Sequence, residues 1–297
     1  MWTPAFARFV APARARASLW RLVFGVVTIA VVYVLGILAI LGAVWGLVGN
    51  AGLTGWMQRI ALADTPTAVL LMLGTFVGMF GGTVVAARLV HKRAPATLTG
   101  DRLWPGFALG TGVAAAIFGL SFLFPLPFEP VRNVPLDIFL TFLPLALLGL
   151  LLQTGAEEVL FRGYLQQQLA ARFDHPAVWI VLPSLVFGAL HYNPALAGPN
   201  ALWLVAAATL FGLVAADLTR VTGSIGVAWG VHFANNAAAI LILALNGSLS
   251  GLSLWKTPFT AADTEILRPL IVADMLTTLI VWAVLRVWLG RRQRLAT

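Results

Sequence analysis

The sequence predicts an all-α, polytopic membrane protein with about eight transmembrane helices and a polar site inside the helical bundle. Composition supports this fold class, because 60% of the 297 residues are hydrophobic and only 10% are charged. Soluble domains carry roughly 25% charged residues. Mean hydropathy is +0.92, and ionisable residues nevertheless recur inside long apolar segments.

A membrane-spanning helix requires about 20 predominantly apolar residues. The predicted spans are 22–48, 67–89, 106–126, 137–160, 177–196, 201–219, 224–246 and 267–289. They define a transmembrane domain over 22–289, between a basic N-terminal segment (1–21) and a basic tail (290–297).

Cationic residues are distributed unevenly between the loops. Placing the N-terminus in the cytoplasm puts 15 of the 19 Lys and Arg residues on the cytoplasmic side. An excess of Lys and Arg is typical of cytoplasmic loops. We therefore expect both termini in the cytoplasm and the chain in the inner (plasma) membrane.

Composition also excludes some classes of partner and site. The net charge is +8, but the basic residues lie between apolar segments and form no stripe, so we expect no nucleic-acid partner. Cysteine is absent, which excludes disulfides and thiolate metal ligands. The expected partners are the lipid bilayer and a peptide or membrane-protein substrate.

Glycines recur at four-residue spacing in three of the predicted spans. Small residues one turn apart allow helix backbones to approach closely in lipid. We expect these glycines to pack helices: Gly74, Gly78, Gly82, Gly106, Gly110, Gly226 and Gly230.

The first polar motif is Glu157-Glu158-x-x-x-Arg162. Glu158 and Arg162 are four residues apart and can pair on one helix face, whereas Glu157 is rotated by about 100° and points elsewhere. Glu157 would then be free to act as a general base. The alternative is a solvated, charged helix end.

The second and third motifs are Phe187-x-x-x-His191 and His232-x-x-x-Asn236. His232 and Asn236 share one face of an apolar helix, where polar groups need partners. Alternatively, His191 is an interfacial residue, and His232 and Asn236 only bond neighbouring helices.

Taken together, these motifs supply one carboxylate, two imidazoles and a carboxamide on three spans. A carboxylate and an imidazole can deprotonate water, and the other groups can donate hydrogen bonds to an oxyanion. This chemistry is that of peptide hydrolysis by water without a covalent intermediate. No Gly-x-Ser-x-Gly sequence is present to support a serine nucleophile.

The three motifs, in this order, resemble those of the CAAX protease and bacteriocin-processing (CPBP, or Abi) family, which includes the type II CAAX prenyl endopeptidases. The resemblance covers residues 137–246. It implies that Glu157 activates water with help from His191, and that His232 and Asn236 stabilise the oxyanion. Glu158 and Arg162 would support the site.

The resemblance leaves metal dependence open. Glu157, His191 and His232 could supply three ligands to zinc with a fourth position open. However, the His-Glu-x-x-His helix of common zinc proteases is absent. We favour activation of water by Glu157 and His191 without a metal.

The predicted function is therefore an intramembrane endopeptidase. One alternative is a non-catalytic membrane scaffold or bacteriocin-immunity partner with the same fold. A transporter is disfavoured, because the two halves of the chain show no repeat and all motif residues lie in the second half. For Asp274, in the last predicted span, we expect a structural role, and for Asp217 and Arg220 a helix-end pair.

Overall fold

The computed structural model describes residues 2–121 and 123–295, without the side chains of 292–295. Residue 1 of the expected N-terminal segment, residue 122 of the expected span 106–126 and residues 296–297 of the expected tail lie outside the described residues. The longer helices are α1 (Pro4–Arg14), α2 (Leu19–Leu62), α3 (Pro66–Gly74), α4 (Phe76–Val85), α5 (Leu103–Ser121), α6 (Leu136–Glu158), α8 (Leu182–Ala189), α10 (Ala201–Thr222), α11 (Gly226–Ala237) and α12 (Thr264–Leu295).

Shorter elements complete the chain. The short α-helices are α7 (Gln167–Arg172) and α9 (Pro194–Ala197), and the strands are β1 (Val131–Arg132), β2 (Leu243–Asn246) and β3 (Trp255–Thr260). Turns of 3-10 helix occupy Pro95–Leu98 and Gly198–Asn200, and π-helical segments occupy Ala86–Val90, Val159–Gln166, Ala177–Val181 and Ala238–Ile242.

The all-α membrane fold is confirmed, although two elements are shorter than predicted. Six apolar helical stretches of the described chain are long enough to cross a bilayer: Leu19–Leu62, Pro66–Val90, Leu103–Ser121, Leu136–Arg172, Pro194–Thr222 and Thr264–Arg291. The predicted spans 177–196 and 224–246 correspond to the shorter apolar helices Ala177–Ala189 and Gly226–Ile242. The first gives way to the turn that carries His191, and the second leads directly into β2.

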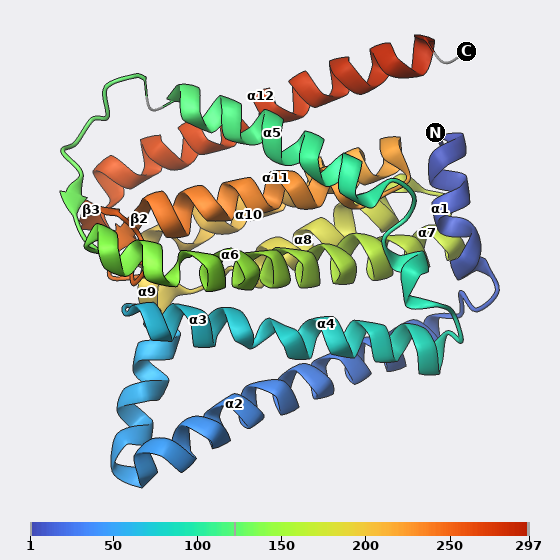
Figure 1. The fold of residues 1–297 in the computed structure, drawn as a ribbon. Helices are drawn as coiled ribbons and strands as arrows, with labels where there is room; N and C mark the ends of the chain where they lie inside the picture. Colours follow the sequence, from blue (N-terminus) through green and yellow to red (C-terminus); the bar gives the residue numbers. More distant parts are fainter. Residues whose placement is uncertain (1, 122, 296–297) are drawn as a thin grey trace.

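The first predicted span, 22–48, ends where the helix breaks at Gly49, but the prediction did not include the helical residues that follow the break. Gly49 has φ 66° and ψ −174°, a conformation that glycine adopts without the steric penalty of a Cβ atom. The chain then resumes helical structure to Leu62, and Figure 1 shows this second part turned sharply from the first.

Figure 1 shows the helices in layers, with α6, α8, α10 and α11 in the middle. Helices α5 and α12 lie on one side, and α2, α3 and α4 lie on the other. Both chain ends lie at the same end of the bundle, and the small sheet closes the opposite end. In that sheet β3 is central, antiparallel to β1 and parallel to β2.

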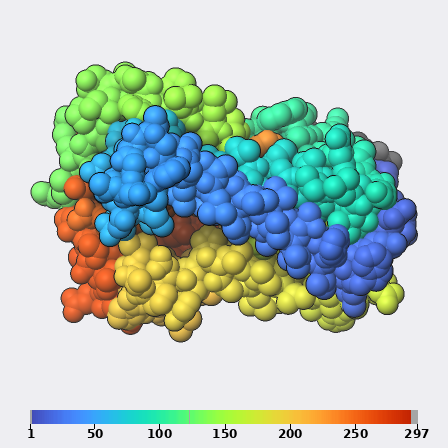
Figure 2. All heavy atoms as spheres, turned by 90° about the horizontal axis from the view of Figure 1, so that it is seen from below, coloured from blue at the N-terminus to red at the C-terminus, as the bar shows by residue number. Residues whose placement is uncertain are grey.

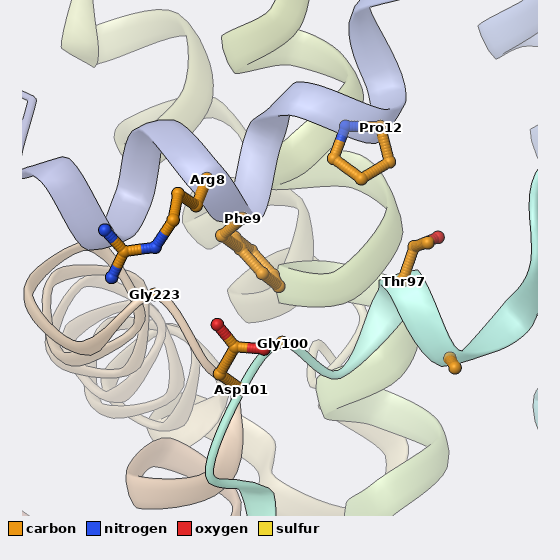
Figure 3. Close-up of a pocket in the computed structure, with 8 residues that line it drawn as sticks. Arg8, Phe9, Pro12, Thr97, Gly100, Asp101 and Gly223 are labelled. Atoms are coloured by element: carbon orange, nitrogen blue, oxygen red, sulfur yellow. The ribbon is translucent and has the colours of Figure 1, made fainter.

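Helix α1 caps the end of the bundle where the termini lie. Its buried face carries Phe6, whose ring centroid is 5.0 Å from that of Trp179. Gln167 Nε2 donates a hydrogen bond of 2.8 Å to the carbonyl of Phe9 and another of 2.8 Å to that of Thr97. The pocket in Figure 3 lies here, between α1 and the loop that carries Asp101, and no residue of the three motifs lines it.

Asp217 and Arg220 form the expected pair, but the pair also joins two helices. Arg220 Nη2 is 2.7 Å from Asp217 Oδ1. The second carboxylate oxygen accepts a hydrogen bond of 2.8 Å from Trp282 Nε1 and pairs with Arg286, both on α12. The prediction of a simple helix-end pair therefore missed a link between α10 and α12, because sequence spacing shows only contacts within one helix.

The glycine repeats pack helices, as predicted. Two of them face each other where α5 crosses α11: a Cβ atom on Gly110 would overlap the carbonyl oxygen of Val227, and one on Gly230 would overlap that of Phe107. The Thr111 hydroxyl donates a 3.2 Å hydrogen bond to the Gly230 carbonyl across the same contact. Because backbone meets backbone, the position of α11, and with it that of His232, is fixed closely against α5.

We predict that Gly110→Ala lowers the free energy of unfolding by about 1–3 kcal/mol, because the added methyl group overpacks a contact that the backbone cannot relieve. Gly112→Ala on the same helix is the matched control, since a Cβ atom there meets nothing within 4 Å. Thermal unfolding in detergent micelles measures both. Equal unfolding temperatures for the two variants would contradict the close contact.

Candidate functional site

The Glu157-Glu158-x-x-x-Arg162 motif lies deep in the bundle, where α6 continues into the π-helical segment Val159–Gln166. Glu158 is completely buried and Arg162 is 2% exposed. Arg162 Nη1 donates to Glu158 Oε1 at 2.8 Å, and Nη2 donates to the Gly212 carbonyl on α10 at 3.3 Å. This burial rules out the alternative of a solvated helix end. It also removes Arg162 from the cytoplasmic loop charges with which it was counted.

Aromatic rings surround the buried guanidinium. Its Cζ atom lies 5.0 Å from the ring centroid of Phe187, 5.7 Å from that of Phe211 and 5.9 Å from that of Phe161. The faces of aromatic rings attract cations, and more strongly where water is excluded. Arg162 is therefore held both by the Glu158 carboxylate and by three rings from separate segments.

His232 lies between the two glutamates. Its Nδ1 is 2.8 Å from Glu158 Oε1, and its Nε2 is 3.3 Å from Glu157 Oε2. The motifs on α6 and α11 thus form one chain of contacts, from Glu157 through His232 and Glu158 to Arg162.

Glu157 is the most accessible member of this chain, with 12% of its side chain exposed. Its Oε2 atom is buried and makes no hydrogen bond of good geometry to any described residue, despite its proximity to His232. Burial without a hydrogen bond is unfavourable for a carboxylate oxygen. Glu157 therefore retains a buried acceptor without a donor among the described residues, beside His232.

His191 lies in the turn after α8 and is exposed. Its Nδ1 is 2.8 Å from the Phe187 carbonyl, which can only accept a hydrogen bond, so the proton is on Nδ1. The Nε2 lone pair of the neutral ring is then free. The Phe187 ring lies 4.8 Å from the ring of His191 and 6.0 Å from that of His232, so it contacts both imidazoles.

Asn236 bonds to a residue that motif analysis missed. Its Nδ2 donates to Gln153 Oε1 at 2.8 Å, and Asn235 Nδ2 donates to Asn236 Oδ1 at 3.3 Å. Gln153 precedes Glu157 by four residues, so the two share a face of α6. The sequence held a signal for Gln153, because it is a polar residue in an apolar helix, one turn before Glu157.

These groups surround a cavity of about 450 Å³, the central cavity. Its polar lining is Gln153, His191, His232, Asn235, Asn236, Asp274 and Thr278, and its apolar lining includes Met72, Phe76, Leu204 and Phe211. Figure 2 shows the molecule hollowed between the blue helices α2 and α3 and the yellow region of α8 to α10. The structure therefore brings both histidines and Asn236 to one cavity, with Glu157 directly behind His232.

The donor set suggested for zinc does not fit a metal site. The described residues contain no group of three or more His, Asp, Glu or Cys side chains placed to hold an ion. Of the three proposed ligands, His232 contacts Glu158 through Nδ1 at 2.8 Å, and its Nε2 lies 3.3 Å from Glu157 Oε2.

We predict that Arg162→Met destabilises the protein by about 3–5 kcal/mol, because it leaves Glu158 buried without its cation. Arg88→Met, at an exposed position, is the control and should leave stability unchanged. Adding Glu158→Gln to Arg162→Met should recover part of the loss. Unfolding in detergent measures all four proteins, and strictly additive losses in the double variant would refute the coupling.

Comparison with known proteins places the site in a family. Residues 139–238 match the model of the type II CAAX prenyl endopeptidase Rce1-like family. That range contains all three motifs. No solved structure matches the chain.

A bacterial relative extends the similarity beyond the motif region. The uncharacterized protein YyaK of Bacillus subtilis (strain 168) is 27% identical over 252 residues, which cover 82% of this chain and 84% of the relative. The family match spans the helices that carry Glu157, His191 and His232. Over residues 139–238, the chain is therefore similar to the CAAX protease (CPBP) family.

Proposed function

We propose that this protein is an intramembrane endopeptidase that hydrolyses a peptide bond with a water molecule activated by Glu157 and His191. The family match supports a CAAX-type membrane protease at the level of class. The observation that carries the residue roles is the placement of His232 between Glu157 and Glu158, at the wall of a cavity that also exposes His191.

Glu157 would be the general base. Its buried Oε2 atom lacks a hydrogen-bond donor of good geometry, and its neighbour Glu158 is already neutralised by Arg162. A water that donates to Glu157 would satisfy this oxygen and lie beside the cavity. General-base catalysis of this kind typically contributes about 10²–10⁴-fold to a rate.

His191 would assist through Nε2. Because Nδ1 is held by the Phe187 carbonyl, Nε2 of the neutral ring has a lone pair that can orient the same water or accept its proton. The exposure of His191 keeps this nitrogen accessible to a peptide in the central cavity.

In the proposed reaction, water gives a proton to Glu157 and its oxygen bonds to the peptide carbonyl carbon. The carbonyl oxygen becomes an oxyanion that accepts hydrogen bonds from the Asn236–Gln153 amide pair. The carbon–nitrogen bond then breaks, and the proton held by Glu157 passes to the leaving amine. Each step needs only these side chains and water.

This scheme refines the oxyanion roles that the family resemblance implies. Asn236 Nδ2 is bound to Gln153 Oε1, which leaves the Gln153 amide nitrogen as a further donor at the cavity. His232 would act mainly by orienting Glu157. We also propose that both termini are cytoplasmic, in the inner membrane. Helix α1 and the C-terminal end of α12 lie at the same end of the bundle, which supports a common side for the two termini.

We predict that Glu157→Gln abolishes proteolysis, with a loss of at least about 10²-fold, because the amide keeps the shape of the side chain but cannot accept a proton. The unfolding temperature should stay close to that of the wild type. Membrane peptidomes of the native host, with wild type or variant expressed, would show fragments that disappear in Glu157→Gln.

Glu129→Gln, an exposed carboxylate away from the cavity, is the matched control and should retain every fragment. Identical peptidomes for wild type and Glu157→Gln at equal expression would refute the protease. That result would favour the membrane scaffold or immunity partner, in which the polar groups only join helices.

A separate prediction concerns metal removal. Exhaustive chelation followed by gel filtration should leave the cleavage rate unchanged, because the described residues contain no group of three metal-ligating side chains placed to hold an ion. The rate of fragment formation by purified protein in liposomes measures this. Loss of activity that zinc alone restores would overturn the metal-free reaction.

A further inference from the structure

Asp274 lies in α12 and lines the central cavity together with His191 and His232. Thr278, one helical turn later, lines the same wall. In Figure 2 the red-brown atoms of the last helix are visible at the bottom of the hollow between α2–α3 and α8–α10. An acidic side chain therefore faces the space in which a peptide would bind.

The carboxylate of Asp274 has no hydrogen bond or ion pair to another described residue. The contrast with Asp217 is informative, since Asp217 pairs with Arg220 and Arg286 and accepts from Trp282. Ionisable side chains within membrane spans are unfavourable, and those that are kept face partners, cavities or pathways. Asp274 faces the cavity and lacks the partner that a structural role requires.

The lining of the cavity indicates what would bind there. Among the described residues that line it, Asp274 is the acidic side chain, and it has no ion-pair partner. A cationic side chain would complement it, whereas a neutral amide would form no ion pair.

We propose that Asp274 binds a lysine or arginine side chain of the peptide substrate near the scissile bond, and so selects substrates with a basic residue at one fixed position. This inference rests on the proposed protease function. The apolar wall formed by Leu204, Ala207 and Phe211 would hold the neighbouring apolar residues of the same peptide. The ion pair would form inside the cavity, where charge attraction is weakly screened.

Peptide binding tests this recognition without requiring cleavage. The probe is a fluorescent, apolar peptide with one central lysine. Its control is the same peptide with glutamine in place of the lysine. The affinity of each peptide is measured for Glu157→Gln protein in liposomes. We expect the lysine peptide to bind at least about tenfold more tightly. Adding Asp274→Asn should remove that difference, whereas adding Glu265→Gln, an acidic residue at the start of the same helix, should retain it.

Equal affinity for the two peptides, or a lysine preference that survives Asp274→Asn, would overturn the proposal. Cleavage of the same peptides by protein with Glu157 intact is measured separately. Lysine-dependent binding without cleavage would count against the protease alone, while cleavage without a lysine preference would count against Asp274 alone.

Discussion

The structure depends on compensation of charge where water is excluded. Arg162 cannot be buried among three phenylalanine rings unless a carboxylate accompanies it, and Glu158 supplies that carboxylate. Glu158 also contacts His232, and His232 reaches Glu157. One ion pair thus links α6, α10 and α11 and sets the position of the group that we propose as the base. The contacts that form the site therefore also hold the core helices together.

Backbone packing between α5 and α11 also fixes the position of His232. The glycines of α5 and α11 bring the two backbones together with no side chain between them. Side chains can change rotamer and absorb a displacement, but contacting backbones cannot. The helix that carries His232 is therefore held against α5 by its glycine face, while Glu157 and Glu158 contact the imidazole on another face.

Much of the fold and part of the site could be predicted from the sequence. Apolar run length predicted six of the eight expected spans correctly, and four-residue glycine spacing predicted close helix contacts, because both are local patterns. The pairing of Glu158 with Arg162 followed from helical geometry. The contacts of His232 with both glutamates, of Asn236 with Gln153 and of Asp217 with α12 could not be predicted, because they depend on how separate helices rotate against each other. The residue roles at the site, and metal-free catalysis, stay predictions.

The π-helical segment Val159–Gln166 has a consequence for the length of the chain. A π-helix closes its hydrogen bonds over five residues, so it accommodates more residues per turn than an α-helix. Deleting one residue there would let the segment close as an ordinary α-helix, so the wide turns would absorb the lost residue and the flanking helices would rotate little. In a regular α-helix the same deletion would rotate everything before it relative to everything after it by about 100°. A difference of one residue in chain length between the glutamates and α7 therefore does not by itself turn Glu157 away from His232.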